Sequence, residues 1–339
     1  MRRFSLIRQA AQARAIAGAL RRHGREQRSP PYAPEPTVPE GAEGFWVQPD
    51  QRVRLRAAFW PGSGRGFVIL LQGRAEFLDK YVEAVGEWRA RGFAVLAFDW
   101  RGQGLSTRQA ADRRLGYVED FKEFQQDLQA VLDHPLVLEI AGPKLMVGHS
   151  MGGAIGVEAL GGPLRERFAG AVFTAPMLGI SLEPGVERLA RRLSARFVRI
   201  KLGQRRAFGQ ERRSGAERPF ENNSLTSDER RFNVMAQLLK ANPELAIGGP
   251  SWAWLAAAFR EIDALAARPR ESLGLPCLVF TCERDTVVQN AAIDVWAERE
   301  PLSRLVNLLD CRHDAWMESD AIRQKLWREI DGYLGERGL

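Results

Sequence analysis

Short apolar runs without alternation recur along the chain, and they limit its possible folds more than any other feature. They are FVILL (67–71), AVLAF (94–98), KLMV (144–147), AVF (171–173), CLVF (277–280) and RLVNLL (304–309). Runs of this kind are typical of parallel strands that helices cover on both faces. Helical patterning occupies residues 79–92 and 119–134 between the runs, and residues 321–334 after them. The alternation predicts a doubly wound α/β sheet with right-handed connections.

Two more strands are expected before the first of these runs. GFWVQ (44–48) and VRLRAAF (53–59) are rich in β-forming residues. The second alternates apolar with polar or small residues, as a half-buried antiparallel strand does. With these two, the sequence predicts a mostly parallel, eight-stranded sheet with helices on both faces.

A long insertion interrupts the rhythm between the runs at 171–173 and 277–280. About a hundred residues lie there, too many for a single crossover helix, and they are helical in pattern and rich in Arg, Leu and Trp. We expect residues 179–260 to form a helical cap over the carboxyl ends of the strands, where open α/β sheets bind ligands. The core of the fold would then comprise residues 41–178 and 261–339.

The first forty residues differ from the rest of the chain. Eight arginines lie within residues 1–30, five prolines follow within residues 29–41, and the whole chain has a formal net charge of +7. The prolines predict an extended linker. Two interpretations of the basic arm stay open: a weak amphipathic helix in peripheral contact with an anionic membrane, or a solvated arm.

Several classes of protein are disfavoured by what the sequence lacks. No run approaches the roughly 18 consecutive apolar residues of a membrane span, and the arginine-ringed start is not a secretory signal. The three cysteines form neither a paired framework nor a zinc spacing, which favours a reduced cytoplasmic protein. If the basic arm binds lipid, we expect the protein to contact the inner membrane peripherally. We expect no cofactor, no metal and no nucleic-acid partner, because no corresponding motif is present.

The segment KLMVGHSMGGAIGVEAL predicts a strand, a sharp turn and a helix, with Ser150 at the turn. Residues 148–152 match the G-x-S-x-G pattern, in which a strained turn lifts a nucleophilic serine above the sheet. The glycines leave room where side chains would collide, and the helix N-terminus favours an anion nearby. Ser150 is therefore the candidate nucleophile.

A serine hydroxyl needs a base, and the chain offers four histidines. His23 lies in the arm and His134 at a helix end, while His149 adjoins the serine and is expected to support the turn. His313 follows the last strand in a loop at its carboxyl end. We therefore predict that His313 is the general base.

The base in turn needs an acid to orient it, and in this fold the order along the chain is serine, acid, histidine. Asp285 follows the strand at 277–280 and is the preferred candidate, with Glu283 as the alternative. Asp314 directly adjoins the base, so we expect its side chain to face elsewhere.

The oxyanion hole should combine two backbone amides. The amide of Met151 follows the nucleophile, and the amide of Arg74 lies in the loop after the strand at 67–71. The Arg74 side chain has two open interpretations: it contacts an anionic head group, or it is merely solvated.

Together these motifs resemble a known family. QGRAEFLDKY, GFAVLAFDWRGQGLS, GYVEDFKEFQQDL, GHSMGG, ERDTVV and RHDAWMES are similar to segments of α/β-hydrolases of the monoacylglycerol lipase and lysophospholipase group, also described as serine aminopeptidase-like. GRAE looks closer to bacterial inner-membrane lysophospholipases than to the His-Gly start common among monoacylglycerol lipases, and Gln72 stands where that histidine would be. The resemblance implies that Asp99 and Arg101 brace their loop.

The expected function is a serine carboxylic-ester hydrolase that acts on lipid monoacyl esters, either lysophospholipids or monoacylglycerols. Alternatives on the same triad are an aminopeptidase-like peptidase and an acyltransferase, and a third is a non-catalytic membrane-associated protein on the same fold. The apolar residues expected to contact the acyl chain, or else to form only the core of the cap, are Met177, Leu178, Trp252, Trp254 and Phe259.

Overall fold

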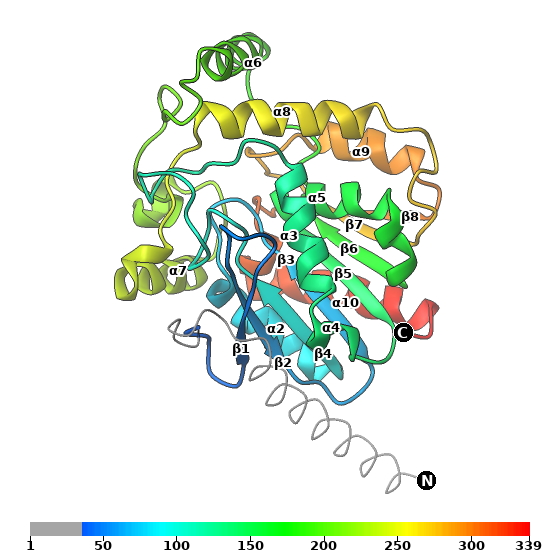
Figure 1. Cartoon of the computed structure of the whole chain (residues 1–339). Helices are drawn as coiled ribbons and strands as arrows, with labels where there is room; N and C mark the ends of the chain where they lie inside the picture. Colours follow the sequence, from blue (N-terminus) through cyan, green and yellow to red (C-terminus); the bar gives the residue numbers. More distant parts are fainter. Residues whose placement is uncertain (1–35) are drawn as a thin grey trace, which may run out of the picture.

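The computed structural model of this protein describes residues 36–339. An eight-stranded sheet forms its centre, in the order β1-β2-β4-β3-β5-β6-β7-β8 (Figure 1). The strands are β1 (Glu43–Val47), β2 (Leu55–Trp60), β3 (Gly66–Leu71), β4 (Phe93–Phe98), β5 (Lys144–His149), β6 (Gly170–Thr174), β7 (Cys277–Cys282) and β8 (Ser303–Leu308). The predictions for the basic arm fall on residues 1–35 and so lie outside the described residues.

The pairing of the strands confirms the predicted mostly parallel sheet. β1 pairs with β2 and β2 with β4 in antiparallel fashion, whereas the strands from β4 to β8 pair in parallel. Every residue of β3, β4, β6 and β7 is buried. This burial explains why these strands are continuous apolar runs: neither face of the inner sheet contacts water.

Helices cover both faces of the sheet, as predicted. α3 (Lys122–Leu132) and α5 (Met151–Leu160) lie on one face, and α2 (Val82–Ala90) and α10 (Asp320–Glu336) on the other (Figure 1). Trp88 of α2 and Trp327 of α10 meet edge to face, with ring centroids 5.1 Å apart. The short α4 (Pro135–Leu138) and α9 (Asn290–Arg299) complete the helices of the core.

The chain between β6 and β7 contains α6 (Pro184–Arg199), α7 (Glu229–Ala241) and α8 (Trp252–Ala266), joined by irregular segments. We refer to residues 175–276 as the insertion. α8 is apolar around most of its circumference, and its buried residues Trp254, Ala258 and Leu265 belong to the main core. The cap boundary predicted at residue 260 falls inside this helix. The division of the chain into a core and a cap at residues 179–260 stays a prediction.

Across residues 36–339, none of the helices combines the length and apolar character that crossing a bilayer requires.

The topology brings the candidate site residues to one edge of the sheet. Ser150 directly follows β5, Asp285 follows β7 and His313 follows β8. Because β5 to β8 run in parallel, the loops after these strands emerge on the same side.

Candidate active site

The turn at Ser150 has the strained geometry that the sequence predicts. Ser150 adopts a φ of 51°, in the left-handed region that residues with side chains rarely occupy. A Cβ atom at Gly152 would lie 2.2 Å from the carbonyl oxygen of Leu71, so only glycine fits there. The serine therefore stands between the end of β5 and the first turn of α5, on a backbone that its neighbours fix.

Ser150, His313 and Asp285 form one hydrogen-bonded series. The Oγ of Ser150 lies 2.9 Å from Nε2 of His313, and Nδ1 of His313 lies 2.7 Å from Oδ2 of Asp285. The side chains of His313 and Asp285 are 4% and 0% exposed. With the imidazole proton on Nδ1, the serine hydroxyl donates to Nε2 and the imidazole donates to the carboxylate.

Asp285 is fixed in its ionised form. Burial acts to raise the pKa of its carboxyl, but the hydrogen bond and charge of His313 and two backbone amides outweigh burial and hold the pKa below its ordinary value. The amides are those of Val287 and Val288, which donate to Oδ1 over 2.7 and 3.0 Å. Glu283, the alternative acid, is exposed and instead accepts a hydrogen bond from the amide of Asp310.

The loop that carries His313 is held by the insertion as well as by the core. The amide of Asp314 donates to the carbonyl of Leu225 over 2.8 Å, and Arg312 donates to two carbonyls of the same segment, those of Asn223 and Thr226, over 3.1 Å each. We refer to residues 223–227 as the tether. The position of the base therefore depends on a segment about ninety residues earlier in the chain.

The two predicted oxyanion amides are those of Arg74, in the loop after β3, and of Met151, at the start of α5. Gly73 donates its amide to the Glu76 carboxylate over 2.6 Å, and Ala75 donates to the side chain of Gln103 over 2.8 Å. Between them, the amide of Arg74 has no hydrogen-bond partner within residues 36–339, and neither has that of Met151 at the start of α5. Two unpaired donors therefore remain near the nucleophile, as an oxyanion hole requires.

A cavity of about 270 Å³ opens at Ser150 and His313. Its other walls come from residues 74–76, which we call the oxyanion loop, from residues 210–225, and from Met235, Val287 and residues 247–249. The irregular segment 210–225 contributes most of the lining. Its role was not predicted, because the segment has neither hydrophobic periodicity nor a motif.

The five residues predicted to contact substrate are elsewhere: all are buried, and none lines this cavity. Trp252 stacks on Phe197 of α6 with ring centroids 4.9 Å apart, and Phe259 lies under the guanidinium of Arg191. Met177 and Leu178 are packed in the main core. Two of the five still contact residues of the site: Trp254 lies beneath the Arg74 side chain, and the backbone amide of Met177 donates to the carbonyl of Ser150 over 2.9 Å.

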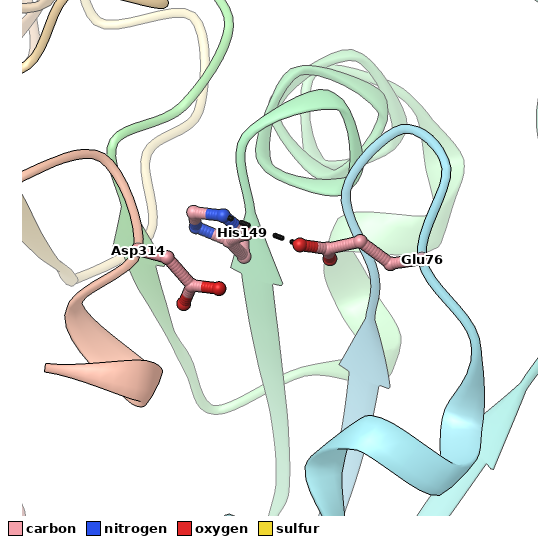
Figure 2. Close-up of side chains that lie close together, drawn as sticks. All are labelled: Glu76, His149 and Asp314. Atoms are coloured by element: carbon pink, nitrogen blue, oxygen red, sulfur yellow. Dashed lines mark ion pairs between the residues drawn. The ribbon is translucent and has the colours of Figure 1, made fainter. Parts of the chain in front are cut away.

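A buried polar cluster lies beside the series and was not predicted. Figure 2 shows Glu76 and Asp314 on either side of the His149 ring. The ammonium of Lys80 forms ion pairs with both carboxylates, and Nδ1 of His149 lies 3.1 Å from Oγ1 of Thr174. Asp314 thus faces away from the base, as expected, and His149 supports the turn as expected.

Lys80 also determines the charge state of this cluster. Burial acts to raise the pKa of Glu76 and of Asp314, but the neighbouring ammonium outweighs it and holds the pKa of both below the ordinary values. Ligand atoms of Glu76, His149 and Asp314 lie within 4.8 Å of one another, a spacing that suits a metal ion. The ammonium of Lys80 already pairs with both carboxylates, so a metal ion would have to displace it.

Asp99 and Arg101 brace their loop, as the resemblance implied. Asp99 accepts a hydrogen bond from Arg56 over 2.7 Å and from the amides of Leu78 and Leu105 over 2.8 Å each. Arg101 forms an ion pair of 2.6 Å with the buried Asp127.

Comparison with known proteins gives consistent matches over most of the chain. The family described as "Serine aminopeptidase, S33" matches residues 62–320. The probable lysophospholipase L2 of Haemophilus influenzae is 26% identical over 80% of this chain and 84% of its own. Lysophospholipase L2 of Escherichia coli (strain K12) is 27% identical over 76% of each chain.

Solved structures show the same fold. A soluble variant of monoglyceride lipase from Saccharomyces cerevisiae superposes with a TM-score of 0.69 at 17% identity, covering 91% of this chain and all of that one. The monoacylglycerol lipase of Paleococcus ferrophilus gives a TM-score of 0.64 at 17% identity, covering 83% of this chain and 98% of the other.

Proposed function

Since this chain belongs to the serine aminopeptidase S33 family of α/β-hydrolases, which are serine hydrolases, we propose that it hydrolyses the single acyl ester of lysophospholipids or monoacylglycerols. The observation that carries the proposal is the hydrogen-bonded series of Ser150, His313 and Asp285 at the cavity. A serine, a base and an orienting acid in this geometry are the elements of acyl transfer through a covalent intermediate.

In the proposed reaction, Nε2 of His313 takes the proton of Ser150 while Oγ attacks the ester carbonyl. The amides of Arg74 and Met151 hold the negative oxygen that forms, and Asp285 stabilises the imidazolium without taking up the proton. His313 then gives its proton to the departing glycerol oxygen. Water, activated by the same imidazole, attacks the acyl-enzyme and releases the fatty acid.

The charges at the cavity support an ester substrate over a peptide with a free N-terminus. A peptidase of that kind needs a free carboxylate to hold the substrate ammonium. The two glutamates that line the cavity are already paired, Glu76 with Lys80 and Glu211 with Arg218 at 3.4 Å. The lysophospholipase names of the curated relatives support a lipid monoacyl ester.

The proposal is tested by measuring product release from three substrates: a 1-oleoyl lysophospholipid, 1-oleoylglycerol and an amino-acid anilide. We expect the purified full-length protein to release oleic acid from at least one of the two lipids and to leave the anilide intact. Cleavage of the anilide alone would favour the peptidase alternative. Hydrolysis of none of the three would contradict the proposal.

A further inference from the structure

The guanidinium of Arg74 is a cation without a counter-charge in the wall of the cavity that contains Ser150. No carboxylate lies within ion-pair distance of it in the described part of the chain, and it donates one hydrogen bond, over 2.9 Å, to the carbonyl of Gly248. An arginine has five N–H donors in a planar fork. Most of the donors of this side chain are therefore left for a ligand.

The surroundings make this charge costly in the empty site. Burial and repulsion from Arg206 lower the pKa of Arg74 to about 10, with only partial compensation from Glu76. Arg206 itself is neutralised by Asp112 at 2.8 Å. A second arginine of the cavity wall, Arg213, also has no ion pair among residues 36–339. A bound anion would offset the buried, unpaired charge of Arg74.

We propose that Arg74 binds the phosphate of a lysophospholipid whose acyl ester lies at Ser150. This inference rests on the proposed function and narrows it, because a monoacylglycerol has no phosphate. The amide of the residue would hold the oxyanion while its side chain holds the head group, so one residue would link recognition to chemistry. A guanidinium fork matches two phosphate oxygens at once, and a lysine ammonium cannot do so.

The test compares kcat/KM for 1-oleoyl lysophosphatidylethanolamine with kcat/KM for 1-oleoylglycerol, in the same neutral detergent micelles. We expect Arg74→Gln to lower the ratio of the two constants about ten- to a hundredfold, the usual effect of losing a hydrogen bond to a charged group. Arg74→Lys should give an intermediate ratio. If the substitution disturbs the backbone amide of residue 74, hydrolysis of both substrates should slow by the same factor. That factor cancels in the ratio of the two constants.

The control is Arg328→Gln, which removes the same charge from an exposed position on α10 outside the cavity. It should leave the ratio unchanged. An unchanged ratio in Arg74→Gln would overturn the inference while leaving the ester hydrolase intact. A site for free phosphate would show itself differently: inorganic phosphate would alter turnover of 1-oleoylglycerol while the ratio stayed constant, which also overturns it. If wild type hydrolyses neither lipid, the proposed function itself fails.

A second, independent observation concerns the outer face of α6, the helix at the top of Figure 1 that packs on the outer side of α8. Apolar residues follow one stripe of the helix at intervals of three or four: Val186, Leu189, Leu193, Phe197 and Ile200. Val186, Leu189 and Ile200 are 53%, 56% and 50% exposed. Phe208, which is 69% exposed, packs edge-on against Phe197 and extends this apolar stripe.

The contact between α6 and α8 combines polar side chains with one aromatic pair. Ser194 is buried there, and Arg191 forms an ion pair of 2.9 Å with Asp263 of α8. Within the apolar stripe, Phe197 serves this contact by stacking on Trp252 of α8, whereas Val186, Leu189 and Ile200 stay exposed. Four exposed arginines of the helix have no ion pair among residues 36–339, namely Arg188, Arg192, Arg196 and Arg199.

We infer that the exposed apolar residues of α6, namely Val186, Leu189 and Ile200, dock on an anionic lipid surface together with these four arginines. Apolar side chains enter the acyl boundary while flanking arginines contact the head groups, as in interfacial helices. A second copy of the chain fits less well, because a two-fold contact would bring the same unpaired arginines together. The irregular chain after α6 lines the active-site cavity, so docking would place that wall near the lipid.

The test measures sedimentation of the full-length chain with phosphatidylglycerol-phosphatidylcholine vesicles and with phosphatidylcholine vesicles. We expect wild type to prefer the anionic vesicles, and Leu189→Ser with Ile200→Ser to weaken its partitioning about tenfold or more, from the apolar area lost. Arg192→Gln with Arg196→Gln should remove much of the preference for anionic lipid.

The matched control is Val295→Ser with Leu309→Ser, at positions 57% and 65% exposed outside α6. All variants keep residues 1–35, so any binding by that arm is common to them. Equal binding of wild type and the α6 variants would overturn the inference, as would wild type that binds neither vesicle. A change of mass by light scattering in the α6 variants would assign the stripe to self-association instead.

Discussion

Replacement of Ser150 by alanine should reduce kcat/KM for ester substrates by about 10⁴- to 10⁶-fold. The hydroxyl is the nucleophile of the series, and its 2.9 Å contact with His313 is what activates it. The residual rate would come from direct attack of water on the ester, with the oxyanion amides still stabilising the negative oxygen. Alanine fits the turn, because it adds no atom that serine lacks.

Two measurements check this expectation. Fatty-acid release gives the rate, and a fluorophosphonate probe should label wild type and leave Ser150→Ala unlabelled. Ser63→Ala, at an exposed serine of a surface loop, is the control and should behave as wild type. Retention of a tenth of the activity by Ser150→Ala, with its thermal unfolding unchanged, would refute the nucleophile assignment.

Replacement of Lys80 by methionine should destabilise the protein by about 3–5 kcal/mol, the usual cost of leaving a buried charge without its partner. The Lys80 side chain is 1% exposed and pairs with both Glu76 and Asp314. Methionine has a similar length and apolar stem, so the loss would be mainly electrostatic. Glu76 also receives the amide of Gly73, so the oxyanion loop should loosen and activity should fall too.

The pH dependence separates this charge effect from a packing defect. Without the ammonium, burial alone would raise the pKa of Glu76 and Asp314 in the folded variant above their values in the unfolded chain. When the pKa of a carboxyl is higher in the folded than in the unfolded protein, the folded protein becomes less stable as pH rises. The deficit of Lys80→Met relative to wild type should therefore be larger at pH 8 than at pH 5.

Urea unfolding at the two pH values measures this difference. The control is Lys325→Met, which breaks an exposed ion pair with Glu329 on α10 and should cost less than about 1 kcal/mol at either pH. A deficit in Lys80→Met that does not change with pH would show that the cluster is not held by the ammonium.

The sheet and its candidate triad were predictable because their signals are local. Each inner strand is an apolar run, and the turn at Ser150 combines glycines with a strand before it and a small-residue helix after it. Asp285 and His313 followed from their order along the chain and from their places after the last two strands. Parallel topology then brings the three together without further information.

The cavity lining and the polar cluster were not predictable, because both depend on contacts between distant segments. The aromatic residues of the insertion indicated burial, yet Trp252 packs against Phe197 and Phe208 instead of lining the cavity. Nothing in the local sequence around Glu76 and Lys80 indicates that these two charges are buried. Only the fold shows that Asp314, more than two hundred residues later, completes their network.

The tether at residues 223–227 has a consequence for the ancestry of such proteins. It anchors the loop of His313, so the insertion is not an appendage that a lineage can exchange whole for another. A recombination event that replaced the whole insertion would leave the loop of His313 without these anchors. The product would lose catalytic activity as well as substrate selectivity. Inherited variation should therefore concentrate on either side of the tether. New specificities would arise by stepwise substitutions around it while the tether itself is retained.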